Sequence, residues 1–331
     1  MELTTVWFTL IGILWTGYLV LEGFDFGVGM LLPVIGRDDT ERRVLINTIG
    51  PVWDGNEVWL IVAGGATFAA FPEWYATLFS GFYLPLLIIL VALIVRGVAF
   101  EYRGTRAEGW WRKRWDLAIV VGSFLPALLW GVALANIVRG VPIDAEGEYT
   151  GGFFTLLNPY ALLGGLTTLT VFLTHGAIFL ALKTSGDIRV RSRRFVALVG
   201  PVAALLAVVF LSWTIAQYGS FAAGVFAVAA AVAFVAGLGA TRMGRDGWAF
   251  AGTAAAIAAT VAALFVSLFP DVMPSTIDAA YSLTTSTASS TPYTLKIMTV
   301  VALVFTPVVL LYQGWTYWVF RKRIGVQHIP Q

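Results

Sequence analysis

The stretch Tyr75–Val95, YATLFSGFYLPLLIILVALIV, is an apolar run long enough to cross a bilayer, and the next segment, Arg96–Arg114, RGVAFEYRGTRAEGWWRKR, carries six positive charges. A helix of about 20 apolar residues spans the hydrocarbon core of a membrane. Lys and Arg concentrate in the loops on the cytoplasmic side of such helices. This run and its basic flank therefore predict a membrane span and its direction.

The same alternation of apolar run and charged gap extends along the whole chain. Nine apolar runs predict nine transmembrane helices, near Val6–Leu32, Gly50–Phe71, Tyr75–Val95, Trp115–Ala135, Pro159–Leu182, Phe195–Gln217, Phe221–Ala240, Trp248–Phe269 and Tyr293–Phe320. Every second gap is basic, and only Arg139 and Lys296 are left on the other side. The bias of positive charge toward the cytoplasm therefore predicts an external N-terminus and a cytoplasmic C-terminus.

The composition indicates the same class of protein. Apolar residues make up 58% of the 331 residues, charged residues only 12%, and the mean hydropathy is +0.81. Such a chain has too little polar surface to cover a soluble globule. We expect an all-α polytopic membrane protein in contact with membrane lipid, with residues 1–331 forming one transmembrane helical domain. Because the positive charges flank the spans, no nucleic-acid partner is expected, and the absence of Cys excludes disulfides and thiolate metal sites.

Four carboxylates fall inside the predicted spans. Glu22 and Asp25 are three residues apart near the cytoplasmic end of the first span, and Asp54 and Glu57 are three apart at the cytoplasmic start of the second. Residues at that spacing share a helix face. At about 1.5 Å of rise per residue, all four lie within roughly 5–15 Å of the same membrane edge, so they could meet.

No Lys, Arg or His is expected at the depth of these carboxylates, so burial and mutual repulsion should favour their protonated forms, which can pass protons. The alternative is that they bond to broken helix ends and to the backbone of nearby glycines, or that they face interfacial water. That alternative weighs more for Glu22 and Glu57 than for Asp25 and Asp54.

Histidine limits the metal chemistry that the chain could perform. His175 is the only histidine inside a predicted span, since His328 lies in the C-terminal tail. A single buried histidine is more often packed or hydrogen-bonded than bound to haem iron, and the spans contain no His pair for copper or di-iron. The sequence therefore predicts that this chain holds no catalytic metal.

Several motifs resemble subunit II of cytochrome bd quinol oxidase. The most specific are GFDFGVGML at Gly23–Leu31, GRDDTERR at Gly36–Arg43 and WDGNEVWL at Trp53–Leu60. The resemblance continues over nearly the whole chain, through Ala69–Pro72, Phe79–Tyr83, Trp115–Asp116, Gly122–Phe124, Asn158–Pro159 and Val272–Ser275.

The resemblance implies a respiratory complex of the bacterial cytoplasmic membrane that oxidises quinol, reduces dioxygen to water and generates proton motive force. Haems b and d are then expected in the partner, subunit I, and none is ligated by this chain. Subunit II of that family has nine spans, arranged as two four-helix bundles plus one peripheral helix. Whether a quinone is also bound to this subunit is left open.

The family also implies roles for individual residues. Asp54 matches an aspartate associated with a polar route that carries protons from the cytoplasm toward the haems, with Asp25, Glu57 and Glu22 as its expected neighbours. Trp59 matches a tryptophan associated with the mouth of a path for dioxygen. The connection between the sixth and seventh spans is only about three residues long, whereas some members carry a long external insertion there.

Two other functions fit the residues. A proton-coupled secondary transporter would use the same carboxylates as coupling sites, although such proteins typically have spans broken at the membrane midplane and internal repeats. The chain could also be a scaffold that stabilises subunit I without moving protons.

Overall fold

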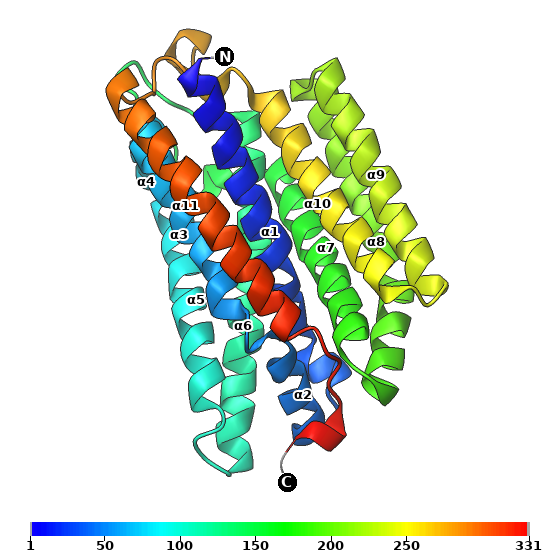
Figure 1. Cartoon of the computed structure of the whole chain (residues 1–331). Coiled ribbons are helices and arrows are strands. Elements are labelled where there is room, and N and C mark those ends of the chain that lie inside the picture. The colour runs from blue at the N-terminus through cyan, green and yellow to red at the C-terminus, as the bar shows by residue number, and fades with distance from the viewer. Residues whose placement is uncertain (1, 330–331) are drawn as a thin grey trace.

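The computed structural model describes residues 2–329, which form an elongated bundle of roughly aligned helices with the two ends of the chain at opposite poles (Figure 1). A two-residue strand, β2 (Leu283–Thr284), pairs antiparallel with β1 (Asp271–Met273) in the connection between α10 and α11. The helices are α1 (Leu3–Ile35), α2 (Asp39–Ile49), α3 (Trp53–Ala70), α4 (Pro72–Gly81), α5 (Tyr83–Tyr102), α6 (Gly109–Arg139), α7 (Pro159–Lys183), α8 (Gly186–Tyr218), α9 (Phe221–Arg242), α10 (Asp246–Leu268) and α11 (Pro292–Val319).

Eight of the helices in the described part are long and apolar enough to cross a membrane, namely α1 and α5 through α11. The prediction of an all-α, multi-pass membrane protein is therefore confirmed. The second predicted span corresponds to α3, which has only 18 residues, carries Asp54 and Glu57 in its first turns and is not among these eight.

The third predicted span differs from the structure at both ends. The chain breaks between α4 and α5 at Phe82, where Pro85 has no N–H to donate to the carbonyl of Gly81. Helix α5 then continues to Tyr102, so Arg96, which is fully buried, lies inside a helix and not in the basic gap where the sequence placed it.

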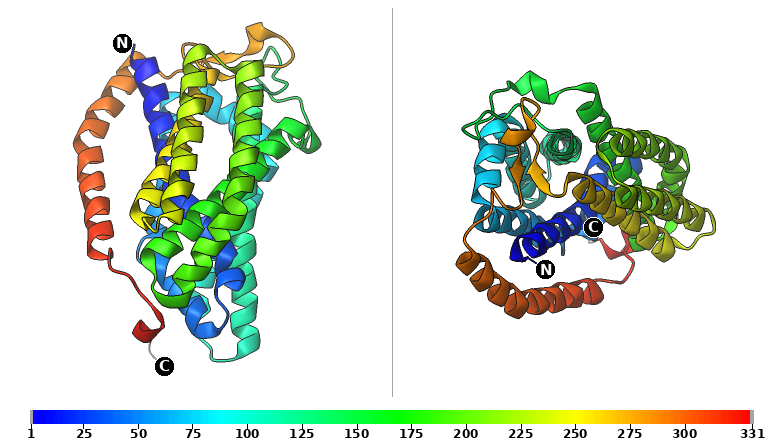
Figure 2. Two further views of the ribbon diagram at one scale, coloured as in Figure 1. Left: turned by 90° about the vertical axis from the view of Figure 1, so that its right-hand side faces the viewer. Right: turned by 90° about the horizontal axis from the view of Figure 1, so that it is seen from above.

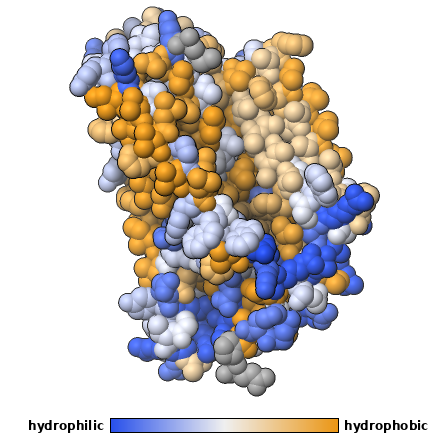
Figure 3. Space-filling view, in the orientation of Figure 1, coloured by the Kyte–Doolittle hydropathy of each residue, from blue (hydrophilic) through white to orange (hydrophobic). Residues whose placement is uncertain are grey.

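Helix α1 lies at the centre of the bundle, against α3, α6, α7 and α10. Helices α3 to α5 lie to one side of it and α8 to α10 to the other, while α11 runs along the outside (Figure 2). The face shown in Figure 3 is apolar over most of its length, and hydrophilic residues are most numerous at the end near the C-terminus. This distribution is that of a protein immersed in lipid with one strongly polar pole.

Two glycines allow α1 and α7 to touch. A Cβ added to Gly27 would lie 2.1 Å from the carbonyl oxygen of Phe172, and one added to Gly176 would lie 2.6 Å from the backbone of Gly27. Small residues at helix contacts in membranes allow the backbones to approach closely. The contact fixes the C-terminal half of α1, which carries Glu22 and Asp25.

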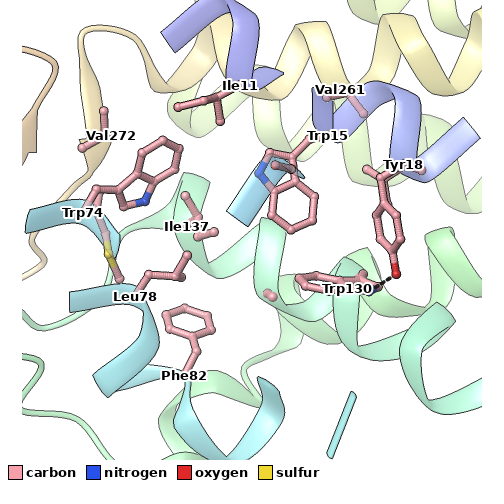
Figure 4. Packing of buried hydrophobic residues seen from close by; sticks show 14 of the residues in the cluster. Ile11, Trp15, Tyr18, Trp74, Leu78, Phe82, Trp130, Ile137, Val261 and Val272 are labelled. Carbon is pink, nitrogen blue, oxygen red and sulfur yellow. Dashed lines mark hydrogen bonds between the residues drawn. The ribbon is translucent and has the colours of Figure 1, made fainter. Parts of the chain in front are cut away.

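An aromatic cluster fixes the other half of α1 (Figure 4). The rings of Trp15 and Trp130 pack edge to face with centroids 4.9 Å apart, and the Trp130 indole N–H donates a hydrogen bond to the Tyr18 hydroxyl at 3.0 Å. Since Tyr18 lies one turn before Glu22, this packing holds the first carboxylate at a fixed depth and orientation.

Candidate functional site

A buried arginine joins two of the predicted carboxylates. The guanidinium of Arg96 donates from Nη1 to Glu22 and to Glu57, the latter at 3.1 Å, and both Arg96 and Glu22 are fully buried. The expectation that no basic residue of this chain reaches the depth of the carboxylates is therefore wrong. Arg96 is held in place by the rings of Phe26 and Phe100, whose centroids lie 4.9 and 5.2 Å from its guanidinium carbon.

The third carboxylate, Asp25, is hydrogen-bonded to an amide from α3. Asp25 is fully buried and accepts a hydrogen bond from Asn56 Nδ2 at 2.7 Å. The side-chain oxygen of Asn56 in turn accepts from the Tyr317 hydroxyl at 2.8 Å and from Gln313 at 3.3 Å. The chain of contacts therefore runs from the buried end of α1 through α3 to α11.

Asp54 stands apart from this cluster. It is exposed in the isolated chain, at the start of α3, and lines a groove of about 610 Å³ between α3 and α11. Asn56, Gln313 and Tyr317 line the same groove, so its wall touches the hydrogen-bonded chain that ends at Asp25. Glu57, one turn deeper than Asp54, keeps 22% of its side chain exposed. Asp54 and Glu57 thus stand between the buried carboxylates and the surface.

Trp59 closes the groove toward α1. Its indole N–H donates to Gln313 at 2.8 Å, and its ring occupies the space beside Gly17, where an added Cβ would lie 2.2 Å from the indole. The ring is therefore clamped between α1 and α11 and is not a loose interfacial anchor.

Four polar atoms of the cluster are buried without a hydrogen-bond partner among residues 2–329: Glu22 Oε2, Asp25 Oδ1, and Nε and Nη2 of Arg96. Unpaired buried polar atoms are uncommon in native proteins and mark places where water or a partner group binds. With three carboxylates around one guanidinium, the cluster also has acidic groups that the arginine cannot neutralise on its own.

His175 does not suit a haem. Its ring is fully buried and stacked on Phe250 with centroids 4.6 Å apart. Nε2 lies 3.2 Å from the carbonyl oxygen of Val20, which can only accept, and Nδ1 lies 2.7 Å from the Thr253 hydroxyl. Both ring nitrogens are occupied, and no cluster of three or more His, Cys, Asp or Glu that could hold a metal occurs in the described chain.

The sequence did not single out Arg96, Asn56, Gln313 and Tyr317. Asn56 could have been found, because it lies between Asp54 and Glu57 in the WDGNEVW motif. Arg96 could have been found as well, since the residues after it remain apolar for one more turn, through Phe100. Gln313 and Tyr317 gave no such signal, because their role depends on α11 lying beside α3.

Fold and site together define a helical membrane protein with a buried ionic cluster near its basic pole and, within the described residues, no group of three or more His, Cys, Asp or Glu that could hold a metal. Residues 3–320 match the family model for cytochrome bd terminal oxidase subunit II. The chain therefore belongs to the cytochrome bd terminal oxidase subunit II family.

Named relatives agree with this assignment. The chain is 43% identical over 329 residues to the cytochrome bd ubiquinol oxidase subunit 2 of Bacillus subtilis, with 98% of this chain and 97% of the relative covered. It is 39% identical over 364 residues to the cytochrome bd-I ubiquinol oxidase subunit 2 of Escherichia coli, covering 98% and 96%. These findings support an oxidase subunit and give no support to a transporter.

The fold has a solved counterpart. A chain of the bd oxidase from Geobacillus thermodenitrificans superposes with a TM-score of 0.78, at 18% identity, over 97% of this chain and 100% of that one. At this level of identity the similarity establishes the fold alone.

Proposed function

We propose that this chain is the subunit II of a cytochrome bd-type oxidase in a bacterial cytoplasmic membrane. With a haem-bearing subunit I it oxidises quinol and reduces dioxygen to water, and the complex generates proton motive force. Family membership supports this proposal, and so does the engagement of both ring nitrogens of His175, which leaves haems b and d to the partner.

Within that complex, we propose that the chain lines a proton path from the cytoplasm. The observation that supports this proposal is that Glu22 and Glu57, from two helices, both contact the guanidinium of Arg96, next to Asp25. Protons would enter at Asp54, pass Glu57 and reach Glu22 and Asp25 at the buried end. Carboxylates in excess of the available positive charge can bind and release protons in turn, which a fixed one-to-one ion pair cannot do.

Exchange of Asp54 for Asn tests this path. Asp54→Asn keeps the size and much of the hydrogen bonding but removes the exchangeable proton. We expect the assembled complex to keep its haems and quinol binding but to lose turnover and charge separation. Glu101→Gln, which neutralises an exposed carboxylate at the cytoplasmic end of α5, is the matched control and should leave both unchanged. An active complex with intact charge separation would exclude an essential path through Asp54, and loss of haems or assembly would indicate the scaffold function.

Glu57→Gln is the companion variant. Glu57 shares Arg96 with Glu22 and retains partial exposure, so we place it on the route between Asp54 and the buried pair. Slowed proton delivery with normal haem content is the expected result. Full activity would leave Glu57 in interfacial water and confine the route to the remaining carboxylates.

We further propose that the surface of α3 binds subunit I. Asp54 is exposed at a depth where a charge needs cover from lipid, and a Cβ at Gly55, Gly64 or Gly65 would meet nothing within 4 Å in this chain. Close helix approach at small residues would bury that face. A Gly64→Leu exchange should then reduce recovery of subunit I with this chain, and normal recovery would contradict the assignment.

For the topology, we propose nine spans, with α3 as the short one, in two groups of four (α1, α3, α5, α6 and α7 to α10) with α11 as the peripheral helix. The N-terminus lies outside and the C-terminus in the cytoplasm, and residues 1–331 form one transmembrane unit. The distribution of positive charge supports this orientation. A reporter fused after Arg323 should be cytoplasmic and one inserted near Glu146 external, and the opposite pattern would refute the topology.

Two further proposals, a dioxygen path and a bound quinone, come from the resemblance to the family. We place the membrane-side mouth of a dioxygen path at Trp59, supported by its position between α1 and α11 at the lipid-facing groove. A Trp59→Ala exchange should change the dependence of turnover on dioxygen concentration. Solvent extraction of the purified complex tests whether a quinone is bound.

A further inference from the structure

Residues of α8 and α9 line a basic groove. These two helices lie on the side of the bundle remote from α3 and α5 (Figure 2). The groove is open, with a volume of about 320 Å³, and belongs to no part of the carboxylate cluster. Its lining combines three arginines with an apolar floor: Arg193, Arg194, Arg242, Val190, Val196, Ala197, Pro201, Leu238 and Thr241.

The arginines of this groove differ in how their charge is balanced. Arg193 donates to Asp246 at 2.8 Å from two of its nitrogens and to the carbonyl of Gly244 at 2.9 Å. Asp246 also accepts from Arg189 at 2.6 Å. Arg193 is therefore largely neutralised within the protein.

Arg194 and Arg242 are exposed and have no carboxylate within ion-pair distance among residues 2–329. Asp246, the acidic residue nearest to the groove in the ion-pair network, is already shared by Arg189, Arg193 and Arg323. Two uncompensated guanidinium groups thus face one groove from neighbouring helices. Guanidinium groups bind phosphate oxygens through paired N–H donors.

The membrane side of the same groove suits hydrocarbon. Below the arginines, Ala197, Pro201 and Leu238 form its floor, and the exposed apolar side chains Leu198 and Val202 continue along α8 toward the membrane interior. A charged head beside an apolar surface is the arrangement of a phospholipid at the hydrocarbon boundary. Basic pockets between transmembrane helices on the cytoplasmic side bind anionic head groups.

We propose that the groove between α8 and α9 binds an anionic phospholipid, with Arg194 and Arg242 holding its phosphate and the floor residues contacting its acyl chains. Free phosphate offers the same oxygens but gains nothing from the apolar floor. Zwitterionic lipid offers a phosphate whose charge is already balanced, so it should bind more weakly.

Lipid retention by the purified complex tests this proposal. The delipidated complex is incubated with vesicles of equal parts phosphatidylglycerol and phosphatidylcholine, purified again, and its retained lipid measured by mass spectrometry. We expect selective retention of phosphatidylglycerol. An arginine near the membrane surface contributes about fivefold to the affinity for anionic lipid, so Arg194→Gln with Arg242→Gln should weaken retention by about 25-fold.

Arg245→Gln is the matched control. Arg245 lies on the same cytoplasmic turn and carries the same charge, but it does not line the groove, so its variant should retain lipid as the unmodified complex does. Haem content and thermal midpoint verify that each variant is folded. If the double variant fails to fold, the single variant Arg242→Gln and the salt dependence of retention in the unmodified complex replace it.

Three results would overturn the proposal. One is equal retention of both lipids by the unmodified complex. Another is unchanged retention of phosphatidylglycerol in the folded double or single variant. The third is saturable binding of inorganic phosphate alone, lost in the same variants, at an affinity equal to that of the lipid.

Discussion

Exchange of Arg96 for Gln should destabilise the protein through charge rather than through packing. Arg96 is fully buried and donates to Glu22 and Glu57. Without Arg96, Glu22 is a buried carboxylate with no cation beside it. Binding a proton costs less free energy than keeping that charge buried, so we expect Glu22 to be protonated in the variant. Protonating an ordinary glutamate side chain at pH 7 costs about 3.7 kcal/mol. Glu57 retains 22% side-chain exposure and can keep its charge in water, so it adds little to this cost. We therefore expect Arg96→Gln to lower the free energy of unfolding by about 3.7 kcal/mol at pH 7.

The pH dependence follows from the proton uptake. In the Arg96→Gln variant the folded state holds a proton on Glu22 that the unfolded state at pH 7 does not hold, so the stability of the variant rises as the pH falls. Each pH unit is worth about 1.4 kcal/mol. The deficit should therefore fall to about 2.3 kcal/mol at pH 6. At about 2 °C per kcal/mol, the thermal midpoint should lie about 7 °C below that of the unmodified complex at pH 7 and about 5 °C below it at pH 6.

The assay is the thermal midpoint of the purified complex at both pH values. Glu22→Gln added to Arg96→Gln should restore most of the lost stability, because a neutral amide needs no proton. Arg114→Gln, an exposed arginine over the ring of Trp110, is the control and should change stability by less than about 0.5 kcal/mol. A deficit that is equal at both pH values and not restored by Glu22→Gln would show that Arg96 acts through its packing on Phe26 and Phe100.

Three shorter predictions test other parts of the structure. Gly27→Ala should lower the yield of assembled complex because α1 and α7 touch there, whereas Gly239→Ala, at a site open in this chain, should not; equal yields would refute the close contact. Asn56→Leu should slow quinol-driven oxygen consumption at normal haem content, because Asp25 loses its donor; unchanged turnover would remove Asn56 from the route. His175→Ala should leave the haem content per complex unchanged, and loss of a haem would contradict its placement in the partner.

Charge and hydropathy predicted most of the fold, because a span must be apolar over its whole length. They failed where local backbone chemistry decides a boundary. The break at Phe82 depends on Pro85 in the first turn of the next helix. Hydropathy does not detect such a break, because the run is apolar on both sides of it. The same difficulty applies to α3, whose polar first turns shorten its apolar part while it still packs along α1.

The sequence placed three of the four carboxylates correctly beside one another but misjudged their electrostatics. Helical spacing is local information, and it put Glu22 with Asp25 on one face and Asp54 near Glu57. Which cation contacts these carboxylates depends on where α5 packs, and the packing of α5 is a matter of tertiary structure. The specific error was to count Arg96 among the loop charges that set the orientation of the spans. A long side chain within a span can reach inward to a carboxylate as readily as outward to the membrane surface.

The position of Arg96 also changes what the cluster can do. Four carboxylates without a cation would all favour protonation and hold their protons tightly, which suits storage more than transfer. One guanidinium contacts both Glu22 and Glu57, so it stabilises the negative charge on either side chain. A proton that enters the pair can then be held by either carboxylate while Arg96 stabilises the charge that remains on the other, so neither site becomes a deep trap. Asp54, one turn away and outside this pair, lines the groove between α3 and α11, where water can reach it. We therefore propose that Asp54 takes up the proton and that the pair transfers it, and we expect Asp54→Asn and Arg96→Gln to impair different steps of turnover.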